Sequence, residues 1–206
     1  MERNAEIKFA RELKSFYSLT FISLVFGAIA MGLSVALGVT NILTFINQWS
    51  PVSLIPACIG FLAFPFTIKW LLSGVEIMDG VNEIKDEYSK VKKGANGEAL
   101  TTLIVRTMAQ YRAKKSTISK LILLCKVAAI CFIINGIFVL IQLALNMPAD
   151  GLLLATSLVV ALINLGIGAV GLYIPRSFQK YSSCWEVRIQ GSALAEKELS
   201  SLMEGK

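Results

Sequence analysis

Histidine is absent from this 206-residue chain, and its four cysteines include no CxxC pair. Without histidine the chain lacks the most common metal and haem ligand and the most common general base. The cysteine spacing predicts neither a structural disulfide nor a zinc site. Nucleotide-binding loops, nucleophile elbows and metalloprotease motifs are also missing. We therefore expect a protein that is not an enzyme and that holds no metal and no cofactor.

Charge is missing from two long stretches, 18–68 and 127–175, which contain no Lys or Arg and only one acidic residue, Asp150. All twenty basic residues fall in the remaining stretches: 1–17, 69–126 and 176–206. Each uncharged stretch is long enough to cross a bilayer twice. Basic residues gather on the cytoplasmic side of membrane proteins. The sequence therefore predicts an all-α, multi-pass integral membrane protein with four transmembrane helices and with both termini in the cytoplasm.

The same pattern divides the chain into five parts. In order, they are a cytoplasmic amphipathic lead-in at 1–17, a transmembrane hairpin at 18–72, a cytoplasmic helical hairpin at 73–118, a second transmembrane hairpin at 119–175 and an amphipathic cytoplasmic tail at 176–206. We expect the lead-in to lie at the membrane interface. The first span is expected to end near Gly38, with an outer turn over 39–52. No signal-peptide cleavage site follows the first apolar run, so we expect this run to remain as an anchor.

A stripe of apolar residues follows the second span at spacings of three and four: Ile77, Val81, Ile84, Tyr88 and Val91. This heptad spacing is typical of a helix that packs against another helix. A comparable stripe follows the glycine-containing break at 94–97. The two stripes can bury against each other, or they can dock a protein partner or a second copy. Docking is the leading hypothesis and would make the chain a subunit or scaffold.

The predicted cytoplasmic hairpin between membrane spans is similar in outline to the membrane insertases of the Oxa type. The resemblance covers topology alone, with no shared motif and no basic residue deep in a span. It implies a lipid-handling or membrane-insertion factor as one alternative function. The basic cytoplasmic face, which is expected to attract anionic lipid headgroups, points the same way. We expect the bilayer as a partner and no nucleic acid, because membrane topology already accounts for the basic charge.

Polar residues form a seam on the last two spans: Asn135, Gln142, Ser157 and Asn164. Counted from the outer turn, the two asparagines lie at similar depth on antiparallel neighbours. An amide in hydrocarbon is costly unless it is hydrogen-bonded, so we expect the two amides to meet each other or water. A hydrogen bond between the helices is the favoured interpretation. The alternative is the lining of a small oligomeric channel or uncharged-solute transporter. No Asp, Glu or Arg lies within any predicted span, which argues against charge-coupled transport.

Small residues recur on two spans, at Ala28, Gly32 and Ala36 and again at Gly168 and Gly171. Such spacing lets helix backbones approach closely, either within one chain or between copies. We favour packing within the chain. Gly60 and Pro65 mark the second span as a bend or a gating hinge, because proline removes one helical hydrogen bond. A fixed bend is the favoured interpretation.

Overall fold

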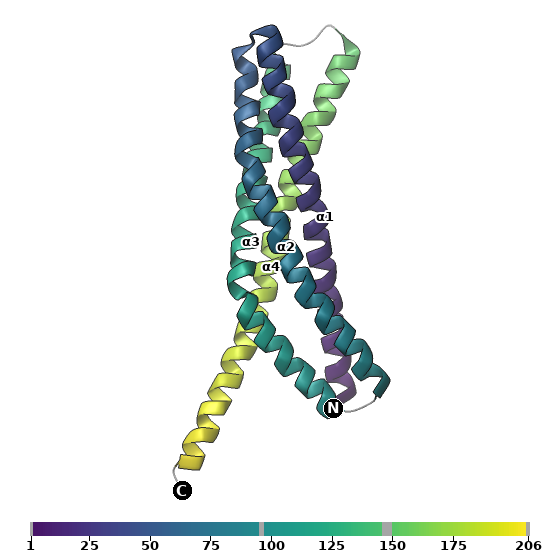
Figure 1. The fold of residues 1–206 in the computed structure, drawn as a ribbon, viewed down its shortest axis with the longest axis vertical. Coiled ribbons are helices and arrows are strands. Elements are labelled where there is room, and N and C mark those ends of the chain that lie inside the picture. Colours follow the sequence, from purple (N-terminus) through teal and green to yellow (C-terminus); the bar gives the residue numbers. More distant parts are fainter. Residues whose placement is uncertain (1, 95–96, 146–149, 205–206) are drawn as a thin grey trace.

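Four long helices make up nearly all of the chain in a computed structural model that describes residues 2–94, 97–145 and 150–204. Within these residues the order is α1 (Glu2–Gln48), the short 3₁₀ turn η1 (Pro51–Ser53), α2 (Leu54–Gly94), α3 (Gly97–Leu145) and α4 (Gly151–Glu204). The helices pack as an up-and-down bundle (Figure 1). The described chain is therefore all-α, as predicted.

Each of the four helices contains an apolar stretch long enough to span a bilayer, with mean hydropathy between 1.8 and 2.5. This confirms four candidate transmembrane helices, as expected of a multi-pass membrane protein. The first residues of α1, the end of α2, the start of α3 and the last residues of α4 lie at one end of the bundle, which we call the basal end (Figure 1). The opposite end, where α1 turns into α2, is the distal end.

The first helix differs from the prediction at both of its ends. The lead-in is not a separate helix on the membrane surface, because α1 begins at Glu2 and buries Phe9 and Leu13 in the core. The outer turn does not begin after Gly38, because α1 continues to Gln48. Polar side chains suggested a turn there, but they bond back to their own helix. Thr40 Oγ1 donates to the Ala36 carbonyl at 2.6 Å, for example.

The reversal between α1 and α2 takes place over a few residues around Trp49. This residue has φ +48°, in the left-handed region that ends a helix, and its side chain is exposed. Pro51 then begins the 3₁₀ turn, where its missing N–H costs nothing. The physical stop signal is the Trp49–Pro51 pair, and the earlier polar residues are ordinary helix.

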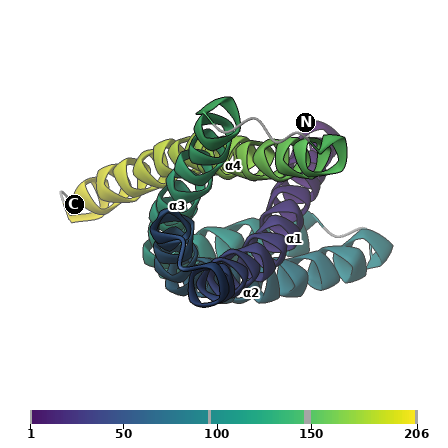
Figure 2. The ribbon, with the colours of Figure 1, turned by 90° about the horizontal axis from the view of Figure 1, so that it is seen from above.

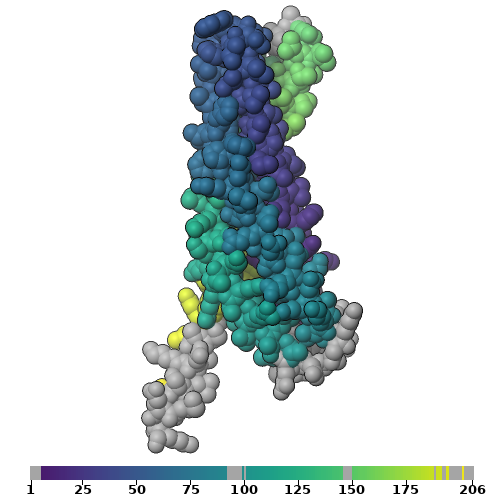
Figure 3. All heavy atoms as spheres, viewed as in Figure 1, coloured from purple at the N-terminus to yellow at the C-terminus, as the bar shows by residue number. Residues whose placement is uncertain are grey.

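Packing around the bundle is uneven. Contacts are extensive between α1 and α2, between α3 and α4, and between α2 and α3, but sparse between α1 and α4. Seen from above, the helices follow one another around the bundle (Figure 2), and in the side view α4 crosses behind α1 (Figure 1). In the space-filling view, the first turns of α4 stand to the side of the α1–α2 pair at the distal end (Figure 3). The bundle is therefore least closed along its α1–α4 side.

The core is richest in large side chains in the basal half, where all four helices meet. α2 contributes Ile77, Val81 and Ile84, and α4 contributes Phe178 and Trp185. Ion pairs on the surface join the helices around this core. Arg106 of α3 bridges to Glu83 at 2.6 Å, and Lys114 bridges to Glu76 of α2 at 2.6 Å. These groups are about half exposed, so water screens each pair and its contribution to stability is small.

Candidate functional site

The apolar stripe predicted as an interaction surface faces the protein's own core. Ile77, Val81 and Ile84 are buried, with 3%, 3% and 6% of their surface exposed. Tyr88 and Val91 are half-buried, and the Tyr88 ring lies 5.7 Å from the ring of Phe9. The residues that cover the stripe come from α1, α3 and α4. Of the two interpretations left open by the sequence, the structure shows burial within the chain.

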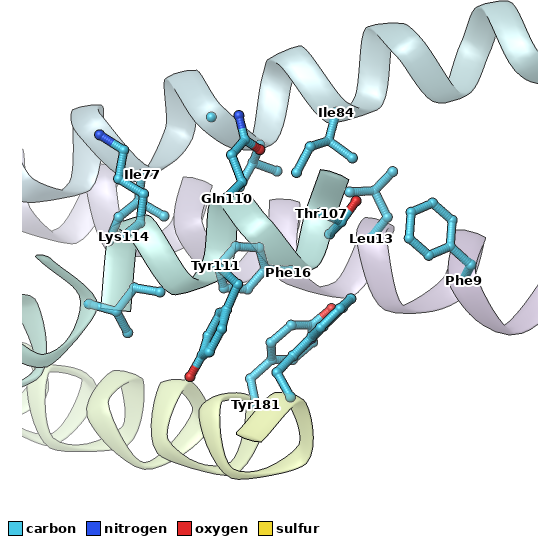
Figure 4. A pocket seen from close by; sticks show the side chains of 14 residues that line it. Phe9, Leu13, Phe16, Ile77, Ile84, Thr107, Gln110, Tyr111, Lys114 and Tyr181 are labelled. Carbon is cyan, nitrogen blue, oxygen red and sulfur yellow. The ribbon is translucent and has the colours of Figure 1, made fainter. Parts of the chain in front are cut away.

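An aromatic cluster closes the basal core between α1, α3 and α4. The Phe16 ring stacks on Tyr181 at 4.7 Å and meets Phe178 edge-on at 5.9 Å. The Tyr181 hydroxyl donates to the Glu12 carbonyl at 2.7 Å. Tyr111 reaches from α3 toward α4, where its hydroxyl hydrogen-bonds Ser182 (Figure 4). The sequence predicted an amphipathic tail, but it did not identify Phe16 as the partner of Phe178 and Tyr181.

A small cavity lies inside this cluster (Figure 4). Its volume is about 50 Å³, and its lining is almost wholly apolar. Gln110 borders the cavity, and its buried Oε1 has no hydrogen-bond partner within the described part of the chain. Sites for small molecules usually measure about 300–1,000 Å³. This cavity is therefore a packing defect or the place of a water molecule, and it is too small for a substrate.

The amides of the polar seam are buried but do not bond to each other. Asn135 is fully buried, Asn164 is 2% exposed, and both lie on the α3–α4 side of the bundle. Asn164 Nδ2 donates to the Val160 carbonyl of its own helix at 2.8 Å. Neither polar atom of Asn135 has a partner among the described residues, and Asn164 Oδ1 has none either. The expected hydrogen bond between the two helices is therefore not formed.

The rest of the seam does not continue as a buried polar path. Gln142 and Ser157 are only half-buried. On the basal side of the asparagines, the interior is filled by large side chains such as Trp70, Phe132 and Phe178, each 1% exposed. The structure thus places two polar side chains in the α3–α4 contact and gives no open path through a single chain in the residues described.

Replacing Asn135 with leucine is expected to leave the free energy of unfolding unchanged or to raise it by up to about 1 kcal/mol, because a buried amide without a partner costs free energy and leucine has a similar shape. Chemical unfolding in detergent micelles would measure the change. A loss of more than about 1 kcal/mol would show that Asn135 has a partner in the membrane, such as water or a second chain. That result would revive the channel alternative, for which flux into liposomes is the direct assay.

The small-residue face expected on the first span lies on the outside of the bundle. Ala28, Gly32 and Ala36 are all exposed, and a Cβ added at Gly32 would meet nothing within 4 Å. The packing within the chain that we predicted for them is therefore wrong. The face of α1 that packs inward carries a different set of small residues, which includes Ser23, Gly27 and Ser34. Serine can take the place of glycine in this helix contact, because Ser34 Oγ donates a hydrogen bond to the Ala30 carbonyl of its own helix at 2.8 Å.

The small residues of the fourth span do lie in a helix contact. A Cβ at Gly168 would fall 3.0 Å from the Ala129 carbonyl of α3, and one at Gly171 would fall 2.9 Å from the Ala129 Cβ. Both distances are too short for an ordinary contact, so any larger residue would force α3 and α4 apart. Two glycines one helical turn apart thus set the spacing of this helix pair.

Gly60 has a packing role in the structure. α2 continues as one helix through Gly60 and Pro65. A Cβ at Gly60 would lie 2.5 Å from the Gly38 nitrogen and 2.8 Å from the Ser34 carbonyl oxygen, both on α1. Such a backbone contact requires glycine, whereas a hinge requires freedom to move. Pro65 is exposed, and its ring lies on the outer face of the helix.

Titratable groups at the basal end are perturbed by structural pairs. Hydrogen bonding to Lys114 lowers the pKa of the Glu76 carboxyl, and pairing with Glu186 raises the pKa of Lys115. Burial raises the pKa of Tyr88. The two ion-paired groups are exposed, and no group of His, Cys, Asp or Glu among the described residues is arranged to hold a metal ion. The arrangement stabilises helix contacts and offers no acid–base pair in a cleft.

Comparison with protein-family models, with curated proteins and with solved structures found no match to this chain.

Proposed function

We propose that this chain is a non-enzymatic integral membrane protein that serves as a subunit or scaffold, and that the last part of α4 is its docking element. The proposal also places the basal end in the cytoplasm, because all the basic stretches lie at that end. The heptad stripe of α2 is occupied by the chain's own core, so docking requires another surface.

The observation that carries the proposal is the course of α4 beyond the bundle. After Trp185 and Ile189, which pack on the core, the helix leaves the other three and continues alone to Glu204 (Figure 1). A lone helix of about 15 residues is only marginally stable in water. Val187 and Leu194 are 69% and 63% exposed, and seven residues apart they lie on one helix face. Burial of this face against a partner or a second copy would stabilise the helix.

Serine at both Val187 and Leu194 is expected to release the docked subunit while leaving the bundle folded. The two side chains are already exposed in the chain, so their loss costs the bundle itself little. The measurement is the mass of the complex after gentle extraction from its native membrane, by native mass spectrometry. The matched control is Val105→Ser, because Val105 of α3 is also 61% exposed at the basal end.

Three outcomes separate the possibilities. A second copy or a foreign subunit that is present in the wild type and in the control, but absent from the double variant, supports the docking role. Retention of the subunit by the double variant assigns docking to another surface. A wild-type chain that is extracted as a monomer, without any stoichiometric subunit, contradicts the proposal.

A further inference from the structure

A groove runs between α1 and α4 on the open side of the bundle, and Tyr181 of the aromatic cluster forms part of its wall. Its volume is about 690 Å³, more than ten times that of the aromatic cavity. α1 lines it with Ser15, Ser18 and Ile22, and α4 lines it with Tyr173 and Ser177. Residues three or four apart lie on one side of a helix, so each helix turns a continuous stripe toward the groove.

Pairings across the two helices define the levels of the groove. Phe16 contacts Phe178, and Tyr181 bonds the carbonyl of Glu12, so the residue numbers of facing positions add up to about 194. Lys14 therefore lies level with Lys180, at the basal mouth of the groove. Because the two helices are antiparallel, later residues of α1 face earlier residues of α4, and such pairs lie deeper in the groove.

Deeper levels of the groove change from polar to apolar. Ser18 lies level with Ser177, and Ile22 lies level with Tyr173. Eight residues separate Lys14 from Ile22, which is about 12 Å along a helix. The groove thus has a basic mouth, a band of hydroxyls and an apolar inner end, in the order in which a bilayer passes from water to hydrocarbon.

The depth of the groove matches the membrane boundary. Arg176 is the first charged residue after the apolar run of α4, and it lies one residue from Ser177. The hydroxyl band is therefore at the level of the headgroups. Tyr173, which is 66% exposed, occupies the interfacial position where aromatic side chains collect.

The two lysines at the mouth are available to a ligand. Neither Lys14 nor Lys180 forms an ion pair with another described residue. The charged lining consists of these two lysines and Glu12, so the lining has a net charge of +1. Since the mouth is basic and the inner end is apolar, the ligand that fits has an anionic head and an apolar tail.

We infer that the α1–α4 groove binds one anionic phospholipid from the leaflet at the basal end. Its phosphate lies between Lys14 and Lys180, its glycerol region lies along the serine hydroxyls, and its acyl chains follow Ile22 into the bilayer. This lipid fills the side of the bundle that the helices leave open. The inference does not depend on the docking role of the tail.

The test uses the full chain in nanodiscs that contain phosphatidylglycerol and phosphatidylcholine in equal amounts with identical acyl chains. Lipids that remain bound after release are counted by native mass spectrometry. One phosphatidylglycerol per chain is expected to remain. Each well-placed lysine contributes about fivefold to binding, so K14Q combined with K180Q is expected to weaken retention about 25-fold. The control, K69Q with K120Q, removes equal charge from α2 and α3 and is expected to change little.

Several results would overturn the inference. Equal retention of phosphatidylcholine would show that the lysines do not select the headgroup. Equal loss in both double variants would show a diffuse basic surface. Displacement of the bound species by soluble glycerol phosphate would show a site for free phosphate esters, without a role for the acyl chains. Absence of any retained lipid in the wild type would show that the groove binds none tightly.

Discussion

Alanine at position 60 is expected to lower the free energy of unfolding by about 3 kcal/mol, although it adds only one methyl group. The new Cβ would lie 2.5 Å from the backbone nitrogen of Gly38 and 2.8 Å from the backbone oxygen of Ser34. Neither backbone atom can rotate away, so α1 and α2 must separate. Separation loses packing along much of the most extensive helix contact in the bundle.

Gly32→Ala is the matched control, because both glycines lie in membrane-spanning helices of the same hairpin. Nothing lies within 4 Å of a Cβ at Gly32, so its substitution is expected to change the free energy of unfolding by less than about 0.5 kcal/mol. Unfolding in detergent micelles, followed by circular dichroism, measures both variants. Equal stability of the two would refute the close approach of α1 and α2 at Gly60.

Trp70→Ala is the second substitution with a large expected effect, a loss of about 3 kcal/mol. The indole is 1% exposed, lies against Gly27, and donates a hydrogen bond from Nε1 to Ser23 Oγ at 3.0 Å. Lipid tails are as apolar as the protein interior, so little of this loss comes from transfer out of water. It comes from the cavity left behind and from the hydroxyl of Ser23 that loses its partner.

Two further substitutions divide the expected loss into its parts. Trp70→Phe keeps most of the packing and removes the hydrogen bond, so it is expected to cost about 1 kcal/mol. Trp49→Ala removes the same indole from a position that is 81% exposed, and it is expected to leave the midpoint of unfolding unchanged. A comparable loss at both tryptophans would contradict the burial of Trp70.

The number of helices was predictable because it follows from where charged residues occur along the chain, and a sequence shows this directly. Two uncharged stretches of about fifty residues leave few alternatives to two hairpins. The ends of the helices were harder to predict, because Thr40 and Asn41 suit a turn and a helix equally well. The reversal is marked by Pro51, which is visible in the sequence, and by the positive φ of Trp49, which is not.

The inward face of α1 was predicted wrongly for a related reason. Gly32 is smaller than Ser34, and a size rule therefore turns Gly32 inward. In the structure Ser34 is the buried one, because its hydroxyl bonds back to the Ala30 carbonyl and then behaves as a small apolar group. The two faces can be distinguished only by the partner helix, whose Gly60 approaches the backbone between Ser34 and Gly38.

The sequence indicated which residues belong to the candidate site, but it did not indicate which residues they contact. The periodicity of Ile77, Val81 and Ile84 indicated an apolar stripe that packs on another helix, but docking was favoured, and the structure buries the stripe in the chain's own core. Phe9 and Leu13 of the lead-in share that core. Contacts between residues so far apart in sequence leave no local pattern, and the α1–α4 groove was missed for the same reason.

The continuity of α4 has a mechanical consequence. Its 54 residues form one rod of about 80 Å. The aromatic contacts of Phe178 and Tyr181 with Phe16 hold the rod to α1, with the free tail on one side and the segment packed on α3 on the other. Pro175 removes one backbone hydrogen bond from the same helix, close to these contacts. A bend between the tail and the segment packed on α3 is therefore expected at Pro175.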